Sequence, residues 1–200
     1  YIPLDFANIK NNQCYYSFLL NEVGGIIDDI IVSKVEINNL LYLFVVYNAS
    51  RKEIDEKIFI DNTDHSKVII NNSYLALQGP ESYDTLSKLI KNLNKLFFMK
   101  ISNFKYKDND ILISRTGYTG EDGFEISIPN IIVNEFVNEL IIFDKTILCG
   151  LGCRDTLRIE AGLSLYGNEL NENLTPIEAG LSWAINKQRL QMNDFNGSNN

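Results

Sequence analysis

Two adjacent carboxylates, Asp28 and Asp29, stand inside the strongly apolar segment 24–32. In an extended strand, residues 27, 29 and 31 point to one face and residues 28, 30 and 32 point to the other. At least one of the two aspartates must therefore share a face with buried aliphatic side chains. An unpaired carboxylate in such a place is costly, so we expect it to have a partner, a raised pKa or a ligand. The alternative is that both aspartates cap the preceding glycine turn or lie at a sheet edge.

A second candidate is the segment 115–126, which contains three glycines at intervals of three residues. This spacing predicts a compact turn between strands, where the backbone can approach a ligand closely. Tyr118 and three acids, Glu125 among them, accompany the glycines. The segment is not a phosphate loop, because it lacks the Gly-Lys-Ser/Thr signature and its acids would repel phosphate. A cationic or amide-rich heterocycle would suit it better, since a glutamate can accept two hydrogen bonds from an amino-pyrimidine edge. The alternative is an ordinary decorated hairpin.

A third candidate is the arginine pair Arg154 and Arg158, which lie one helical turn apart in the segment 150–160. Their spacing places both on one helix face, and their guanidinium forks suit carboxylates. The alternative is a set of ion pairs within the helix, such as Arg154 with Asp155 or Glu160. The spacing favours pairing of Arg158 with a ligand or a remote acid.

The overall charge argues against a polyanionic partner. The 200 residues carry a formal net charge of −8, and the 18 lysines and arginines are scattered along the chain. Such a protein repels nucleic acid and anionic membrane. No apolar run approaches the roughly 18–20 residues that a membrane helix needs. The first residues show no signal or transit peptide, so we expect either a cytosolic chain or a targeting segment outside this sequence.

The cysteines do not indicate a metal site or a disulfide framework. There are three of them, an odd number in a long chain, which disfavours a framework of disulfides. Cys149 and Cys153 lie four residues apart, but the only histidine, His65, is far away in the sequence. A zinc site would therefore lack ligands, and we expect no bound metal.

The elements that must position these residues alternate between strands and helices. We expect strands at residues 15–20, 26–35, 40–47, 68–70, 74–77, 111–114 and 124–128, and helices at 50–59, 81–96, 131–142 and 154–162. The second and third strands should form a hairpin, and 68–70 should pair with 74–77. Ser50 should cap its helix, and Gly162 should follow the end of the last one. Hairpins mixed with helices in this way predict an α+β fold.

At these residues the chain resembles the glycine cleavage T-protein family. The matching segments are residues 21–32, 47–49, 75–80, 115–126, 150–167 and 175–183, and their order and spacing agree over nearly all 200 residues. Several such motifs in order are far more specific than any one of them. The resemblance implies ferredoxin-like α/β units around a central folate pocket. It also implies that the chain is a folate-binding domain, residues 1–200, with further family segments upstream and a barrel-like domain downstream.

The resemblance implies an aminomethyltransferase with tetrahydrofolate as the cofactor. In that reaction an aminomethyl group on the lipoyl arm of H-protein meets tetrahydrofolate, giving methylenetetrahydrofolate, ammonia and the dihydrolipoyl protein. The implied partners are folate and lipoylated H-protein, with no nucleic acid and no membrane. The implied location is the mitochondrial matrix in a eukaryote and the cytoplasm in a bacterium.

The family's site residues are carried across motif by motif. Asp29 is the implied catalytic residue, which would hold the N10 region of the folate and stabilise a developing iminium charge. Glu125 would hold the pterin edge. The remaining implied folate-binding residues are Asn48, Tyr118, Arg154, Tyr16 and Ile31, of which the last two only line the pocket.

Three alternatives remain beside this interpretation. The first is a folate-binding protein of iron–sulfur assembly, whose Lys-Gly-Cys-Tyr/Phe-x-Gly-Gln-Glu signature is absent from the sequence. The second is a related folate-dependent demethylase or the folate domain of a dimethylglycine-type oxidase. The third is a non-catalytic folate-binding remnant, against which the intact Asp29 and Glu125 argue. Two departures from the family are Cys153, where alanine is usual, and Asn168-Glu169, where Asn-Asp is usual.

Overall fold

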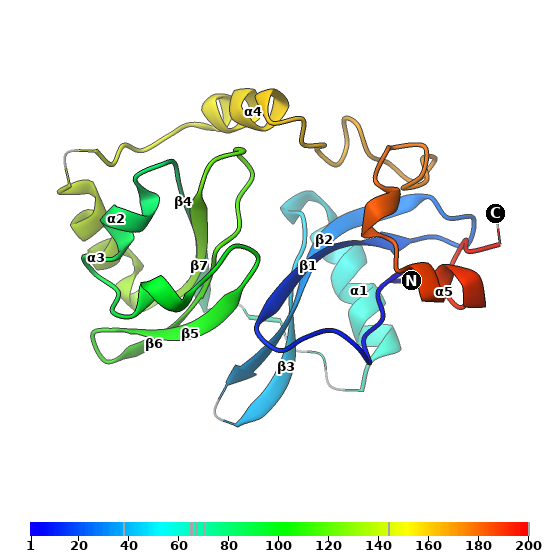
Figure 1. The fold of residues 1–200 in the computed structure, drawn as a ribbon, viewed down its shortest axis with the longest axis horizontal. Coiled ribbons are helices and arrows are strands. Elements are labelled where there is room, and N and C mark those ends of the chain that lie inside the picture. The colour runs from blue at the N-terminus through cyan, green and yellow to red at the C-terminus, as the bar shows by residue number, and fades with distance from the viewer. Residues whose placement is uncertain (38, 65, 67, 70, 144, 200) are drawn as a thin grey trace. The chain divides into compact units, whose positions relative to one another are not determined.

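The computed structural model describes residues 1–37, 39–64, 66, 68–69, 71–143 and 145–199 (Figure 1). The chain forms two compact units. The first comprises Tyr1–Lys34, Leu41–Val68 and Ser164–Asn200, and the second comprises Val35–Leu40 and Ile69–Leu163. Both contain antiparallel strands and helices, which confirms the predicted α+β class.

A three-stranded sheet organises the first unit. Its strands are β1 (Gln13–Leu20), β2 (Ile26–Ile37) and β3 (Leu40–Val46), in the order β1-β2-β3. The predicted hairpin of the second and third strands is therefore confirmed, although Asn38 of its turn lies outside the described residues. In the antiparallel register of β1 and β2, Tyr16 lies opposite Ile31 and Phe18 lies opposite Asp29.

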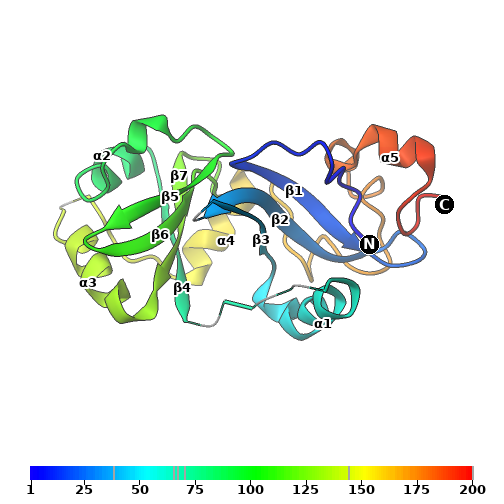
Figure 2. The same ribbon diagram turned by 90° about the horizontal axis from the view of Figure 1, so that it is seen from below.

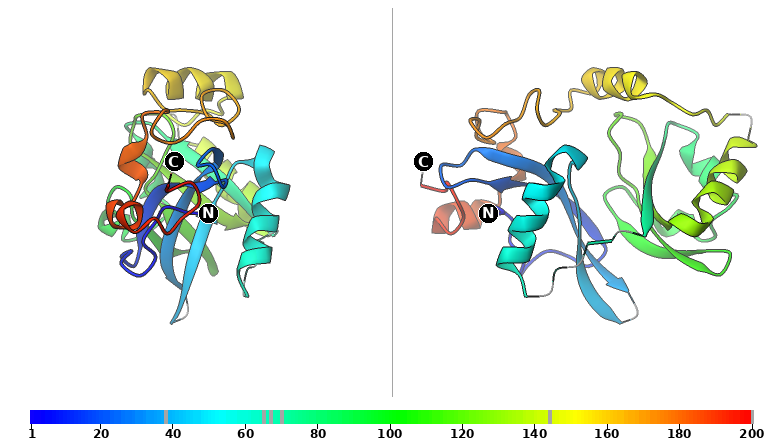
Figure 3. Two further views of the ribbon diagram at one scale, coloured as in Figure 1. Left: turned by 90° about the vertical axis from the view of Figure 1, so that its right-hand side faces the viewer. Right: turned by 180° about the vertical axis from the view of Figure 1, so that it is seen from behind.

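The two faces of this sheet bury different apolar clusters. On one face Leu19, Ile30 and Val32 pack with Ile58 and Phe59 of α1 (Lys52–Asn62), which follows the 3-10 turn η1 (Ala49–Arg51). Figure 3 shows α1 lying along the sheet. The other face carries a second cluster, whose buried members are Phe18, Leu20, Ile26, Leu170 and Ala184. The alternation of side chains along β2 thus separates two environments for its polar residues.

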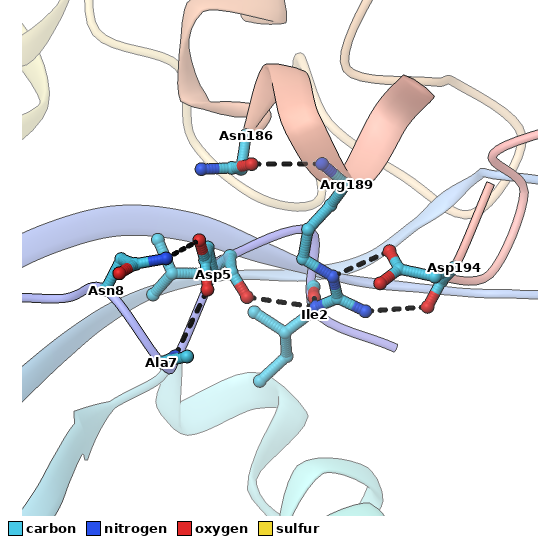
Figure 4. Close-up of polar contacts among 8 residues, drawn as sticks. Ile2, Asp5, Ala7, Asn8, Asn186, Arg189 and Asp194 are labelled. Atoms are coloured by element: carbon cyan, nitrogen blue, oxygen red, sulfur yellow. Dashed lines mark hydrogen bonds and ion pairs between the residues drawn. The ribbon is translucent and has the colours of Figure 1, made fainter. Parts of the chain in front are cut away.

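Arg189 ties the start of the chain to the short helices near its end, η3 (Ser182–Ala184) and α5 (Lys187–Met192). Its guanidinium donates to the backbone oxygens of Ile2 and Leu4 at 2.6 and 2.9 Å (Figure 4). It also donates to the side chain and the backbone oxygen of Asp194 at 2.8 and 2.6 Å. The Asn186 side chain caps α5 by accepting from the Arg189 backbone N–H.

The second unit is built on a four-stranded antiparallel sheet. Its strands are β4 (Asn72–Gln78), β5 (Ile101–Tyr106), β6 (Asn109–Ser114) and β7 (Gly123–Pro129), in the order β4-β7-β6-β5. The helices α2 (Ser82–Leu86) and α3 (Asn130–Ile141) pack on the sheet and share a buried cluster with it that includes Phe124 and Phe136 (Figure 2). The predicted helix 131–142 and the two strands around the glycine-rich turn are confirmed.

The last helix of the second unit, α4 (Leu151–Glu160), ends as predicted at Gly162, which has φ +69°. The Gly162 N–H donates to the Ile159 oxygen and the Leu163 N–H donates to the Arg158 oxygen. This pattern is the Schellman motif, for which glycine is the favoured residue.

Three local predictions are wrong. The segment 81–96 is not one helix: α2 ends at Leu86, and the 3-10 turn η2 (Leu93–Lys95) follows Asn92, whose left-handed φ of 62° interrupts an α-helix. The leucines and the isoleucine at helical spacing, from which this helix was predicted, are nevertheless removed from water: Leu86, Ile90, Leu93 and Leu96 are at most 2% exposed, and Leu89 is partly buried. β4 pairs with β7 instead of with residues 68–70, of which 68 and 69 lie outside any strand and 70 lies outside the described residues. Ser50 does not cap α1, because η1 precedes that helix.

The helices of the described part of the chain are all too short or too polar to cross a membrane.

Candidate functional site

The two neighbouring aspartates of β2 lie in different environments, as strand parity predicts. Asp28 is completely buried, on the face that also buries Ile30 and Val32. Asp29 is only partly buried and lies across from Phe18 of β1. The alternative of a cap or an edge position does not hold, because both residues lie within the central strand of the sheet.

Asn48 holds both aspartates from the end of β3. Its side-chain amide donates to Oδ1 of Asp28 at 2.9 Å and to Oδ1 of Asp29 at 2.8 Å. Its backbone N–H donates to Oδ2 of Asp28 at 2.9 Å. Asn48 therefore bridges two carboxylates whose charges repel each other, and this contact fixes the orientation of Asp29.

The hydroxyl of Tyr16 supplies the second hydrogen bond to Asp29, at 3.1 Å from Oδ2. Burial, followed by the negative charge of Asp28, raises the pKa of Asp29 to about 6, and the bonds from Tyr16 and Asn48 act in the opposite direction. Asp29 is thus mostly ionised at neutral pH, but close enough to its pKa to respond to a charged ligand. Such a carboxylate can stabilise a cation or hold a proton.

Ile31, Tyr16 and Asp29 share one face of the sheet, because Ile31 lies opposite Tyr16 and two residues along β2 from Asp29. Trp183 extends this face: its ring stacks on Tyr16 at a centroid distance of 5.5 Å and an angle of 23°. Trp183 is 69% exposed, which is unusual for so large an apolar side chain. The structure thus adds an aromatic residue that the sequence analysis placed in a matching segment but not in the site.

Asp55 is a further residue that the sequence analysis missed. It lies on α1 and is completely buried, and neither of its carboxylate oxygens has a hydrogen-bond donor among the described residues. Burial, followed by the neighbouring carboxyl group of Asp28, raises its pKa to about 8. A signal was present in the sequence, because residue 55 shares the helix face of Ile58 and Phe59, which pack against the sheet.

In the second unit, Glu125 of β7 is the corresponding perturbed carboxylate. It is partly buried and accepts a hydrogen bond from the hydroxyl of Thr116 at 2.5 Å. Burial raises the pKa of Glu125, while Thr116, the positive charge of Arg154 and Tyr74 lower it. A glutamate in this position can accept hydrogen bonds from a ligand in addition to the one from Thr116.

Arg154 and Tyr118 form a contact within the same unit. The guanidinium carbon of Arg154 lies 4.9 Å from the centroid of the Tyr118 ring, which is a cation–π contact. The predicted residues Tyr118, Glu125 and Arg154 therefore belong to one local group in the second unit. Asp29, Asn48, Tyr16 and Ile31 belong to one local group in the first.

The glycine-rich turn makes its close approach to the protein's own side chains. A Cβ on Gly117 or Gly123 would lie 1.8 or 2.1 Å from Oε1 of Gln78. The amide of Gln78 donates to the backbone oxygens of Thr116 and Phe124 at 3.1 and 3.3 Å. These two glycines thus make room for the side chain that braces the turn, and this explains their position without a ligand.

Arg158 takes part in an ion pair within its helix. The spacing of the arginines favoured a ligand or a remote acid as its partner, and an ion pair within the helix was the alternative. Arg158 is 3% exposed, and its Nε donates to Oδ1 of Asp155, three residues earlier on α4, at 2.8 Å. Its Nη1 donates to the backbone oxygen of Leu163 at 3.2 Å. Arg158 therefore stabilises the end of its own helix, and it forms the intrahelical pair with Asp155 in place of Arg154.

Cys14 is buried whereas Cys149 and Cys153 are exposed, and none of the three forms a disulfide with another described residue. Across the residues that the structure describes, no three histidine, cysteine, aspartate or glutamate side chains are grouped so that they could hold a metal ion. His65 lies outside those residues.

Comparisons with known proteins place the chain in one family. Residues 2–189 match the family model described as the GCVT N-terminal domain. The chain is 41% identical to the mitochondrial aminomethyltransferase of Saccharomyces cerevisiae, over 98% of this chain and 53% of the yeast protein. It is 44% identical to the aminomethyltransferase of Thermoanaerobacter pseudethanolicus, over 92% of this chain and 52% of that protein.

A solved structure is similar over nearly the whole chain. The crystal structure of glycine cleavage system aminomethyltransferase T from Bartonella henselae superposes with a TM-score of 0.89 at 34% identity, and covers 99% of this chain and 54% of that one. The chain thus spans about half the length of the relatives that it matches.

Proposed function

The chain belongs to the glycine cleavage T-protein family, and on this premise we propose that it is the folate-binding domain of a tetrahydrofolate-dependent aminomethyltransferase. The donor is the aminomethyl group on the lipoyl arm of H-protein, and the products are methylenetetrahydrofolate, ammonia and dihydrolipoyl protein. The observation that carries the proposal is the partly buried Asp29 carboxylate, which Tyr16 and Asn48 hold in one orientation.

Asp29 acts by electrostatic stabilisation. Transfer breaks the C–S bond to the lipoyl arm and the C–N bond to ammonia, and it forms two bonds from the carbon to folate nitrogens. The one-carbon unit passes through a cationic iminium, which a nearby carboxylate stabilises. This role requires an ionised Asp29, and a pKa of about 6 satisfies the requirement at neutral pH.

The group in the second unit has the chemistry to bind a pterin. Glu125 can accept hydrogen bonds from the amino-pyrimidine edge, and the charge of Arg154 favours the ionised state of Glu125. Tyr118 and Arg154 present a flat, polarisable surface against which a heterocycle can pack.

The names of the relatives favour this reaction over that of a folate-dependent demethylase and over a role in iron–sulfur assembly. The presence of both Asp29 and Glu125 argues against a non-catalytic remnant. Relatives from yeast and mouse are named mitochondrial, so a eukaryotic source implies the mitochondrial matrix and a bacterial source the cytoplasm.

The proposal is tested by calorimetry of the full-length protein with tetrahydrofolate. We expect saturable binding that Glu125→Gln weakens about tenfold or more, because an amide presents one acceptor and one donor where the carboxylate presents acceptors only. Glu135→Gln is the matched control, since Glu135 is an exposed acid on α3. Absence of folate binding to the unmodified protein would defeat the proposal.

A further inference from the structure

The proposed reaction does not use Asp55, although its setting is the most unusual of any acid that the structure describes. It is 0% exposed, as is Asp28, and Asp28 is close enough to raise the pKa of Asp55. Two buried carboxylates at close range cannot both be ionised without a large repulsion, and a shared proton removes it.

The hydrogen bonds indicate which of the two groups carries the proton. Asp28 accepts one N–H from the backbone of Asn48 and one from its side chain, and such bonds favour the charged form. Neither oxygen of Asp55 has a donor among the described residues. A protonated Asp55 needs no donor, because it can itself donate to Asp28.

Arg51 does not supply the missing partner. Its Nη2 donates to Oε1 of Glu172 at 2.6 Å, and its guanidinium carbon lies 5.0 Å from the centre of the Tyr166 ring. Its positive charge lowers the pKa of Asp55, but burial and Asp28 outweigh it, and the net result is a pKa of about 8.

The remaining ionisable groups around Asp55, unlike Arg51, do not favour its ionised form. Asp29 of β2 raises its pKa further. Burial is the main cause that raises the pKa values of Tyr47, at the end of β3, and of Tyr166, so both side chains are neutral at neutral pH and supply no positive charge to Asp55. Among the described ionisable groups that act on Asp55, only Arg51 thus favours its ionised form.

We propose that Asp55 is a positioning residue that carries a proton in the folded protein and donates a hydrogen bond to the Asp28 carboxylate. Asp28 then holds Asn48, and Asn48 holds Asp29, so a proton on α1 fixes the carboxylate that faces the substrate. The consequence for catalysis rests on the function proposed above, whereas the proton itself does not.

The proton is tested without any ligand by NMR titration of the aspartate carboxyl carbons in the full-length protein. We expect one resonance with a midpoint near pH 8, far above the ordinary aspartate pKa of about 3.9, and its loss in Asp55→Asn. Asp61→Asn, which changes an exposed aspartate of the same helix, should retain it. A midpoint for Asp55 in the ordinary aspartate range would overturn the proposal.

The linkage to stability gives a second readout. An acid whose pKa is raised by folding destabilises the protein as the pH rises from its unfolded to its folded pKa. The difference in melting temperature between Asp55→Asn and the wild type should therefore shift in favour of the variant as the pH rises from about 4 to about 8, since the amide never ionises. A constant difference over this range would contradict the proposal.

The positioning role is tested by tetrahydrofolate binding at pH 7. Asp55→Asn retains a donor and should bind within about threefold of wild type, whereas the apolar Asp55→Leu, which has no donor, should bind about tenfold more weakly. Equal affinities of the asparagine and leucine variants would refute the role. If the unmodified protein bound no folate while the titration near pH 8 remained, the proposed function would fail and the protonated Asp55 would stand.

Discussion

Replacement of Asn48 by alanine removes a side-chain amide that donates to both aspartates of β2, at 2.9 Å to Asp28 and 2.8 Å to Asp29. The backbone N–H of residue 48 still donates to Asp28, so the loss falls mainly on Asp29. A hydrogen bond to a charged group contributes about 1.5–3 kcal/mol, and about 1.4 kcal/mol corresponds to one pH unit of pKa. The pKa of Asp29 should therefore rise from about 6 by roughly one to two pH units.

The variant should also change how stability depends on pH. Folding raises the pKa of Asp29, so the wild type loses stability as the pH rises from about 4 to about 6. In Asn48→Ala this loss should continue to a higher pH, because the folded-state pKa is higher.

Carboxyl-carbon NMR titration of the full-length protein measures the pKa directly, and thermal denaturation at several pH values measures the linkage. Asn62→Ala is the matched control: Asn62 is an exposed asparagine of α1 whose amide donates to the Ile58 backbone oxygen, away from both aspartates. If the pKa of Asp29 were the same in Asn48→Ala as in the wild type, the bridge would not hold the carboxylate and the reasoning would be refuted.

Two further predictions concern stability. Arg189→Ala removes the donors to Ile2, Leu4 and Asp194 and should lower the free energy of unfolding by roughly 2–4 kcal/mol in urea denaturation. Arg189→Lys should be intermediate, because lysine keeps the charge but lacks the forked guanidinium group. An unchanged denaturation midpoint would show that these hydrogen bonds do not stabilise the fold. Gly25→Ala would place a Cβ 1.8 Å from the Glu172 backbone oxygen, so it should lower the free energy of unfolding by roughly 1–3 kcal/mol in the same assay. An unchanged stability would show that the turn can move to make room for the added methyl group.

Strand patterning predicted the different environments of Asp28 and Asp29 well, because a period of two is a local property. The alternation of side chains along the strand is enough to separate Asp28 from Asp29, and the two residues do lie on opposite faces of β2. What the pattern could not supply was the partner of each aspartate. Asn48 comes from the end of another strand, and Asp55 comes from a helix 27 positions along the chain from Asp28. Such partners are fixed by tertiary packing.

The prediction of a helix at residues 81–96 failed because the burial of side chains does not determine the conformation of the backbone. Residues such as Leu86, Ile90 and Leu93 are buried at the spacing of a helix, yet Asn92 adopts a left-handed conformation that ends any continuous helix there. The apolar pattern indicates which side chains are buried, but it is the same whether they lie in a helix, a 3-10 turn or a bend. The absent pairing of residues 68–70 has a similar origin, because β7, far along the chain, is the partner of β4.

The group around Glu125 in the second unit shows that the glycines of a motif can have a purely structural explanation. Gly117 and Gly123 make room for Gln78, so their presence is explained by the turn itself. Glu125 is not explained by the turn, because burial opposes its charge and Thr116, Arg154 and Tyr74 offset this only in part. The proposed contact with a ligand therefore rests on Glu125 and not on the glycine spacing.

The proposed role of the Asp29 carboxylate is to stabilise the transfer of a one-carbon unit to tetrahydrofolate. The most direct measurement is the rate of ammonia release from aminomethylated, lipoylated H-protein, with and without tetrahydrofolate, by the full-length wild type and Asp29→Asn. We expect tetrahydrofolate-dependent release by the wild type and a decrease of about 10²–10³ in turnover for the variant, because asparagine keeps the size but not the charge. Full turnover by Asp29→Asn would contradict it.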